Sequence, residues 1–172
     1  MAQHMATPPK VLVLGLGNVL WGDDGFGVRA IEALQRRYRF PEQITLMDGG
    51  TQGFCLVPHV QAADILVVFD ALDYGLPPGS LKQIQGGEVP KFLGTRKTSL
   101  HQTGFDEVLA LAGMLEDSPG QLLLIGVQPV ELENFGGGLH PSVQRQIEPA
   151  LGMALDYLER LGVIPYERLA AG

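Results

Sequence analysis

Four polar residues in this 172-residue chain have the types and positions that a chemical site needs. Asp23 and Asp24 follow an apolar run that ends in glycines, and Asp70 ends a second apolar run. His101 precedes an amphipathic stretch. Two carboxylates and an imidazole form an O,O,N donor set that suits borderline divalent metals such as Ni, Zn, Mn or Fe. A carboxylate can also activate water. The sequence therefore predicts metal contact or water activation by Asp24, Asp70 and His101.

Strands and helices must bring these residues to one place. Apolar runs predict buried strands at 10–15, 43–47, 65–69 and 122–127, and alternation predicts an edge strand at 80–85. Helices are expected at 24–39, 51–60, 102–116 and 141–161, and residues 88–100 are expected to be irregular. Strands that alternate with helices favour an α/β three-layer sandwich, with a mostly parallel sheet of about five strands and helices on both faces.

The predicted topology gathers the polar residues at the carboxyl edge of the sheet. Asp24 and Asp70 follow two strands that share a crevice if these strands are neighbours. A helix that feeds a parallel strand begins at the same edge, so His101 is expected there too. The positive end of a helix favours the ionised form of Asp24. The same field favours a neutral imidazole, the form that binds metal.

Each of these residues also has a structural interpretation. Asp23 and Asp24 could cap a helix, and His101 could be a capping or core histidine. Asp70 is harder to explain in this way, because an acid that ends a buried strand needs a partner.

Four other polar residues are interpreted mainly as structural. Asp48 is expected to close a Gly-Gly turn, with support of the site as the alternative. Cys55 is interpreted as a small core residue, and His59 and His140 as structural histidines.

Composition excludes several classes of protein. The net charge of −7, with no basic stripe, argues against nucleic acid and anionic membrane surfaces as partners. A single cysteine excludes an intramolecular disulfide framework. No apolar run reaches the roughly 18 residues that a membrane helix needs. We expect one cytoplasmic, monomeric domain at 10–172, after a disordered or expression-derived tail at 1–9.

Several motifs along the chain match one known family. They are GLGNVLWGDDGFGV at 15–28, DGGT at 48–51, FDA at 69–71, PG at 78–79, SLHQ at 99–102, LIGVQP at 124–129 and IEPA at 147–150. In this order they closely resemble the hydrogenase maturation endopeptidases, over nearly the whole chain beyond residue 9. The residue types at two positions, Trp21 and Phe26, resemble those of the branch of this family that acts on membrane-associated uptake hydrogenases.

The resemblance implies a fold, an activity and a site. The fold is similar to the phosphorylase/hydrolase-like α/β sandwich. The family removes a C-terminal extension from the large-subunit precursor of nickel-iron hydrogenases after nickel insertion. Its nickel-contacting positions fall on Asp24, Asp70 and His101, with nickel supplied by the substrate. Many members carry Glu at the position of Asp24, so the carboxylate reaches less far here. We expect support of the site or of substrate binding from Asn18, Trp21, Asp48, Gly49, Gly50 and Thr51.

Alternatives to this endopeptidase remain open at the level of sequence. The chain could be a nickel-dependent docking or checkpoint chaperone that does not cut the precursor, or a protease with tightly held zinc. Gly15 and Gly17 form a weak nucleotide-binding fingerprint, without a lysine to anchor phosphate. No Gly-x-Ser-x-Gly elbow is present, so we expect an aspartic-type mechanism in which a carboxylate, with Asp70 first, acts on water.

Overall fold

The computed structural model describes residues 7–95, 105–114, 117–163 and 167–168, and a five-stranded sheet forms its centre. The strands are β1 (Val11–Leu16), β3 (Ile44–Gly50), β4 (Ile65–Ala71), β5 (Leu81–Gln85) and β6 (Gln121–Val127). Their order is β3-β1-β4-β6-β5. All neighbours are parallel except β5, which runs antiparallel to β6. The predicted mostly parallel sheet and its edge strand are confirmed.

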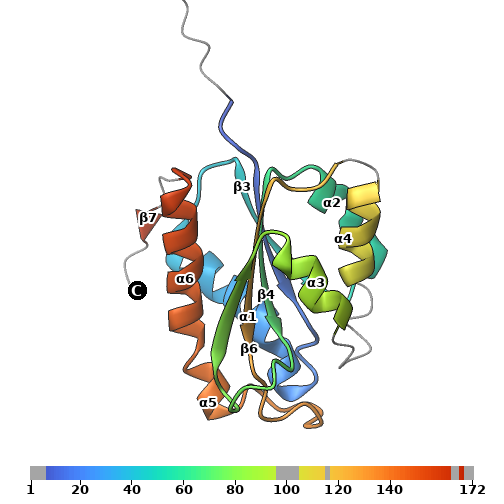
Figure 1. Cartoon of the computed structure of the whole chain (residues 1–172). Coiled ribbons are helices and arrows are strands. Elements are labelled where there is room, and N and C mark those ends of the chain that lie inside the picture. The colour runs from blue at the N-terminus through green and yellow to red at the C-terminus, as the bar shows by residue number, and fades with distance from the viewer. Residues whose placement is uncertain (1–6, 96–104, 115–116, 164–166, 169–172) are drawn as a thin grey trace, which may run out of the picture.

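Helices cover both faces of the sheet, which gives three layers (Figure 1). α1 (Phe26–Arg37) and α6 (Ile147–Arg160) lie on one face. α2 (Val57–Gln61), α3 (Glu88–Thr95) and α4 (Phe105–Met114) lie on the other. Shorter elements are η1 (Gly22–Gly25), η2 (Gly53–Leu56), α5 (Pro141–Gln144) and the pair β2 (Tyr38–Arg39) and β7 (Glu167–Arg168). Among the described residues, no helix is long and apolar enough to cross a membrane.

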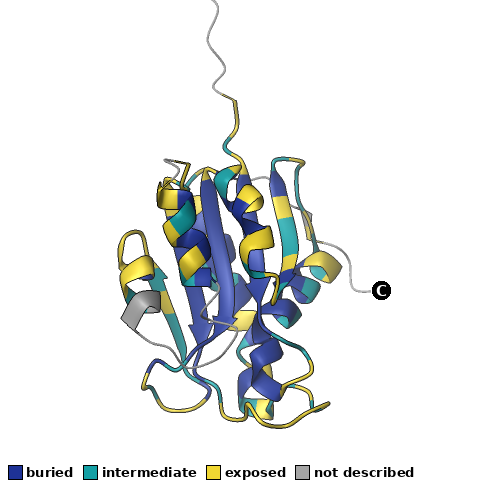
Figure 2. Cartoon of the chain, turned by 90° about the vertical axis from the view of Figure 1, so that its right-hand side faces the viewer, coloured by how far each residue is buried: buried dark blue, intermediate teal, exposed yellow. Residues whose placement is uncertain are grey.

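The central strands are buried on both faces, which explains their unbroken apolar sequences (Figure 2). Along β4, Ile65, Val67 and Phe69 pack toward α1 and α6. Leu66 and Val68 pack toward α2 and α4. Side chains alternate between the two faces of a strand. Asp70, the next residue of this alternation, therefore belongs to the α2–α4 face.

The structure corrects three predicted boundaries. Residues 88–95 form α3 and are not irregular, because Pro90 lies in the first turn, where its missing N–H is tolerated. The predicted helix at 141–161 is two helices, because Pro149 cannot donate to residue 145 and its ring crowds that carbonyl. The predicted helix at 24–39 begins as η1 and ends at Arg37, because Tyr38 is extended and pairs with β7.

Candidate functional site at the carboxyl edge of the sheet

Glycines allow the loop after β1 to fold tightly against the sheet. A Cβ on Gly27 would lie 2.3 Å from the carbonyl oxygens of Leu16 and Phe69. A Cβ on Gly17, whose φ is +118°, would lie 1.8 Å from the carbonyl oxygen of Asp24. Only glycine permits these approaches. The start of α1 therefore sits on β1 and β4, which are neighbours in register from Val11 and Ile65 onward.

Asp24 is held at this edge by the backbone of its own loop. It is 5% exposed, and its Oδ2 accepts a hydrogen bond from the backbone N–H of Asn18 at 3.0 Å. The Asn18 side chain closes the same turn, since its Oδ1 accepts from the N–H of Leu20 at 3.0 Å. Asn18 thus supports Asp24 through its main chain and orders the turn with its side chain.

Asp70 is the second buried carboxylate of the site. It is 4% exposed, and its Oδ1 accepts a hydrogen bond from the N–H of Ala71 at 2.8 Å. Burial raises the pKa of Asp70 well above its ordinary value, and the negative charge of Asp24 raises it further. The Ala71 hydrogen bond opposes this shift. The two predicted carboxylates therefore lie close enough to interact, and this interaction favours the protonated form of Asp70 more than in an exposed aspartate.

Asp23 has a role that the sequence did not reveal. It is fully buried, and its Oδ2 accepts from the N–H groups of Val130 and Glu131, both at 2.8 Å. Its Oδ1 accepts from the N–H of His140 at 2.7 Å. Asp23 therefore binds the loop between β6 and α5 to the loop that carries Asp24. These partners are 107 to 117 positions away in sequence, so no local pattern could have identified them.

Tyr74 and Gln128 are further site residues that sequence reasoning missed. Gln128 Oε1 accepts from the N–H of Tyr74 at 2.7 Å and of Leu76 at 3.2 Å, which fixes the segment after β4. The Tyr74 hydroxyl fills the space above Gly126, where a Cβ would lie 1.5 Å from it. Gly126 pairs with Asp70 in the sheet, so the hydroxyl lies on the Asp70 side of β6.

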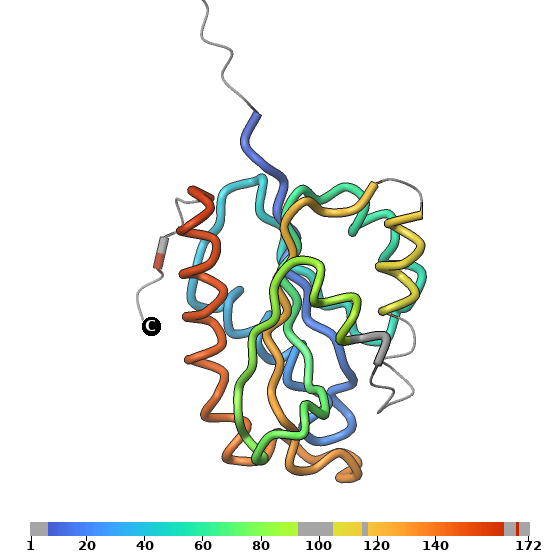
Figure 3. Tube along the Cα trace, viewed as in Figure 1, coloured from blue at the N-terminus to red at the C-terminus, as the bar shows by residue number. Residues whose placement is uncertain are grey.

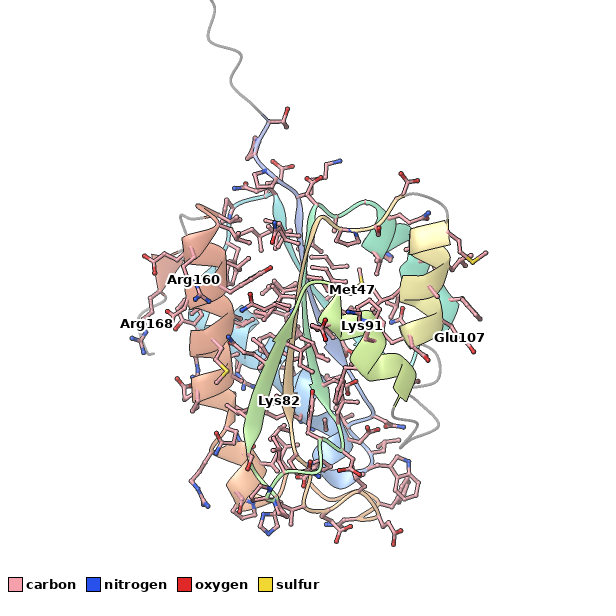
Figure 4. The ribbon with its side chains drawn as sticks, in the orientation of Figure 1. Met47, Lys82, Lys91, Glu107, Arg160 and Arg168 are labelled. Atoms are coloured by element: carbon pink, nitrogen blue, oxygen red, sulfur yellow. The ribbon has the colours of Figure 1, made fainter. Side chains whose placement is uncertain are left out.

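Tyr74 is buried between an aromatic ring and charged groups. Its ring stacks on Phe92 at 4.8 Å between centroids, and Lys82 Nζ lies 5.9 Å from the Tyr74 centroid. Lys82 extends from β5 on this side of the sheet (Figure 4). Burial and the charge of Asp70 raise the pKa of Tyr74 well above its ordinary value. The hydroxyl therefore keeps its proton, and it has no hydrogen-bond partner among the described residues.

Asp48, one of the predicted support residues, lies in a turn beside the Asp24 loop. Asp48 is exposed and closes its own turn, with Oδ1 accepting from the N–H of Gly50 at 2.9 Å. This confirms the favoured interpretation. The carbonyl oxygen of Gly50 also accepts from the N–H of Gly17, which joins this turn to the Asp24 loop.

The other predicted support residues differ in exposure. Gly49 is buried and Thr51 is exposed. Trp21 is 38% exposed beside the site, with its ring 5.0 Å from that of Phe135.

The remaining candidates are located as follows. His101 lies outside the described residues, and the described residues contain no cluster of three metal-binding side chains. The core assignment of Cys55 is wrong, because Leu56 and Val57 take the buried positions and Cys55 is exposed. His140 is structural as predicted, since its Nδ1 caps α5 by accepting from the N–H of Ser142. His59 is exposed on α2, and its role stays a prediction.

Fold and site define an α/β protein with an acidic site at the carboxyl edge of its sheet. Such a pair of coupled carboxylates is suited to proton transfer with water or to contact with a metal ion. The family model for hydrogenase maturation protease, HycI, matches residues 28–157. The chain belongs to the hydrogenase maturation protease family.

Individual relatives agree with this assignment. The chain is 60% identical to the hydrogenase expression/formation protein HupD of Thiocapsa roseopersicina, over 95% of this chain and 74% of that protein. It is 40% identical to the hydrogenase 2 maturation protease of Escherichia coli K12, over 93% and 98%. The solved structure of the hydrogenase maturating endopeptidase HybD from E. coli has a TM-score of 0.85 and 38% identity, over 93% and 96%. The uptake-type name HupD agrees with the expected branch.

Proposed function

We propose that this protein is an aspartic-type endopeptidase that removes the C-terminal extension of a nickel-iron hydrogenase large-subunit precursor after nickel insertion. Substrate-borne nickel would be contacted by Asp24, Asp70 and His101, so that only a loaded precursor is held in place for cleavage. The observation that supports this most is the buried Asp24–Asp70 pair, which lies where two parallel strands end. Membership of the protease family supports the hydrolytic step.

The raised pKa of Asp70 suits it to act on water. A carboxylate with a higher pKa is a stronger base, and enzymes tune general bases upward by burial and by a neighbouring charge. Once ionised, Asp70 takes a proton from water as the water oxygen bonds to the scissile carbonyl carbon. The carbon–nitrogen bond then breaks, and the proton passes to the leaving amine. Asp24 and the nickel contact would fix the substrate for this step.

The proposal also includes the cellular compartment, the partner and the oligomeric state of the enzyme. A single exposed thiol, Cys55, fits a reducing compartment such as the cytoplasm. The net charge of −7 favours a partner with basic segments and disfavours nucleic acid. We propose a monomeric enzyme, which meets its precursor transiently and needs no resident nickel.

The test is cleavage of the host's large-subunit precursor, with and without nickel loaded, followed by mass spectrometry of the products. We expect loss of a C-terminal peptide from the nickel-loaded precursor alone. Binding of a verified nickel-loaded precursor without any cleavage would contradict the endopeptidase and favour a docking chaperone.

The variant Asp70→Asn tests the residue assignment. Asparagine keeps the size of the side chain but cannot take a proton from water, so cleavage should fall by at least about 1,000-fold. Asp156→Asn, an exposed carboxylate on α6, is the matched control and should cleave normally. Normal cleavage by folded Asp70→Asn protein would exclude Asp70 from the chemistry.

A further inference from the structure

Large apolar side chains gather on two loops beside the acidic site. Seven large apolar residues are exposed in the described part of the chain, and five of them lie on these loops. We call the five residues the apolar platform: Leu20 (50% exposed), Trp21 (38%), Val130 (41%), Leu132 (37%) and Phe135 (66%). Exposed apolar groups gathered in this way, with polar residues around them, mark interaction sites.

The two loops that carry the platform are in contact although they are far apart in sequence. The loop after β6 lies beside the loop after β1 (Figure 3). Trp21 and Phe135 form a β-bridge, and their rings meet edge to face at 5.0 Å. The N–H of Gly136 donates to the carbonyl oxygen of Leu20 at 2.8 Å. These contacts hold the two loops together, which reduces the entropy lost when a partner binds to them.

The platform is also fixed relative to the site. Asp23 accepts three backbone hydrogen bonds from the β6–α5 loop, and its own N–H donates to the carbonyl oxygen of Glu131 at 2.8 Å. Asp24 follows directly in the chain. A polypeptide that brings a peptide bond to Asp24 and Asp70 would lie at the edge of the sheet from which both loops extend, so its neighbouring residues would be close to the platform.

Charge on the two loops indicates the chemistry of the partner. Glu131 and Glu133 are exposed beside the apolar residues, and neither loop contains Lys or Arg. An apolar segment with basic side chains next to it complements such a surface, because opposite charges steer association and an aromatic centre supplies affinity.

We propose that the apolar platform docks an apolar segment of the hydrogenase large-subunit precursor, flanked by Lys or Arg, next to the scissile bond. This inference rests on the proposed function. It assigns Leu20, Val130, Leu132 and Phe135, together with Trp21, to substrate recognition. Asp23 would be a positioning residue that keeps this surface in register with Asp24.

The experiment compares a double variant, Leu132→Ser/Phe135→Ser, with the wild type and with the control Met114→Ser. Met114 is 81% exposed at the end of α4, just before the chain enters the amino end of β6, far from the site. We measure kcat and KM for the nickel-loaded precursor, and thermal unfolding of each variant. The double variant should raise KM at least about tenfold and change kcat less than about twofold. Met114→Ser should leave both parameters unchanged.

A second double variant tests the role of the negative charges on the β6–α5 loop. Glu131→Gln/Glu133→Gln keeps the apolar groups and should lower the association rate several-fold at low salt, with a weaker salt dependence than the wild type. An unchanged association rate would contradict the part of the proposal that places Lys or Arg beside the docked apolar segment.

The outcomes separate this inference from the proposed function. Failure of the wild type to cleave the precursor would contradict the proposed function. The platform would then still be tested by comparing the affinities of the wild type and of the double variant for the precursor. An unchanged KM and unchanged binding in a stably folded double variant would overturn the platform. A wild-type dimer that the double variant abolishes, with unchanged KM, would assign this surface to a second copy of the chain instead.

Discussion

At the scale of single residues, burial sets the chemistry of Asp70. Its neighbours on both faces of the sheet are apolar, and Asp24 adds a like charge. Both influences favour the neutral carboxyl in the free protein. In the proposed mechanism, the same group becomes an effective base when the substrate favours its ionised form, for example by presenting a cation. Asp70 would then be neutral in the free protein and act on water only when the substrate is bound.

The raised pKa of Asp70 predicts a pH-dependent stability in the metal-free protein. In the unfolded chain this carboxyl titrates near pH ~4. Above that pH the unfolded state releases its proton first, so the free energy of unfolding decreases until the pH passes the folded pKa. Asp70→Asn should remove this decrease, so its advantage over wild type should grow as pH rises above about 4. Urea unfolding across this range measures the effect, and parallel curves for the two proteins would contradict it.

Tyr74 offers a second test at this scale. Its buried hydroxyl lacks a described partner, so Tyr74→Phe should leave the free energy of unfolding unchanged or raise it by up to about 1 kcal/mol. The control Tyr74→Ala also loses the stacking on Phe92 and should be destabilised by about 3 kcal/mol. Denaturant unfolding compares them. A loss above 1 kcal/mol in Tyr74→Phe would show that the hydroxyl forms a hydrogen bond that stabilises the fold.

At the scale of elements, one carboxylate joins two loops that build the site. Asp23 satisfies three backbone donors of the β6–α5 loop, and each would be left unpaired without it. Asp24, its neighbour in sequence, accepts a hydrogen bond from the N–H of Asn18 in the first loop. The two adjacent acids therefore have different contacts: Asp23 joins the two loops, and Asp24 lies beside Asp70 at the edge of the sheet, where we propose that the substrate binds.

Asp23→Ala should therefore loosen the β6–α5 loop. Loss of three hydrogen bonds to a charged acceptor should reduce the free energy of unfolding by about 3 kcal/mol. Hydrogen exchange of the backbone N–H groups of Val130, Glu131 and His140 should accelerate, while exchange in the central strand β4 follows only the global loss. Asp23→Asn keeps one carbonyl oxygen and should be intermediate. Unchanged exchange at these three positions in Asp23→Ala would exclude Asp23 as the anchor of the loop.

At the scale of the whole molecule, the described part of the fold brings two buried carboxylates, Asp24 and Asp70, to one edge of the sheet. The described residues contain no cluster of three metal-binding side chains, and the predicted third contact, His101, lies outside them. Sites with few protein ligands and open positions hold free metal weakly and suit a metal carried by the substrate.

The purified protein should accordingly contain far less than one nickel or zinc per chain after dialysis. Elemental analysis by mass spectrometry measures this directly. The matched sample is the protein incubated with its nickel-loaded precursor before separation, in which nickel should remain with the precursor. One tightly bound zinc per chain in the free protein would contradict substrate-borne nickel and would show that the metal is resident.

The amino-acid sequence by itself determined the sheet, most of the covering helices and the place of the two carboxylates, whereas the covering helix α3 was predicted to be irregular. Buried strands such as β4 have unbroken apolar sequences, and the carboxyl ends of parallel strands meet at one edge, so Asp24 and Asp70 could be placed from local patterns alone. The break between α5 and α6, at residues 145–146, was missed because the helical periodicity continues through it.

Only the tertiary structure decided the roles of Asp23, Tyr74 and the apolar platform. The acceptor bonds of Asp23 reach more than 100 positions along the chain. Tyr74 lies over Gly126 because β4 and β6 are paired. Trp21 meets Phe135 through a bridge between two loops. Hydrophobic periodicity reports which face of one element is buried, whereas these contacts depend on how separate elements are placed in space.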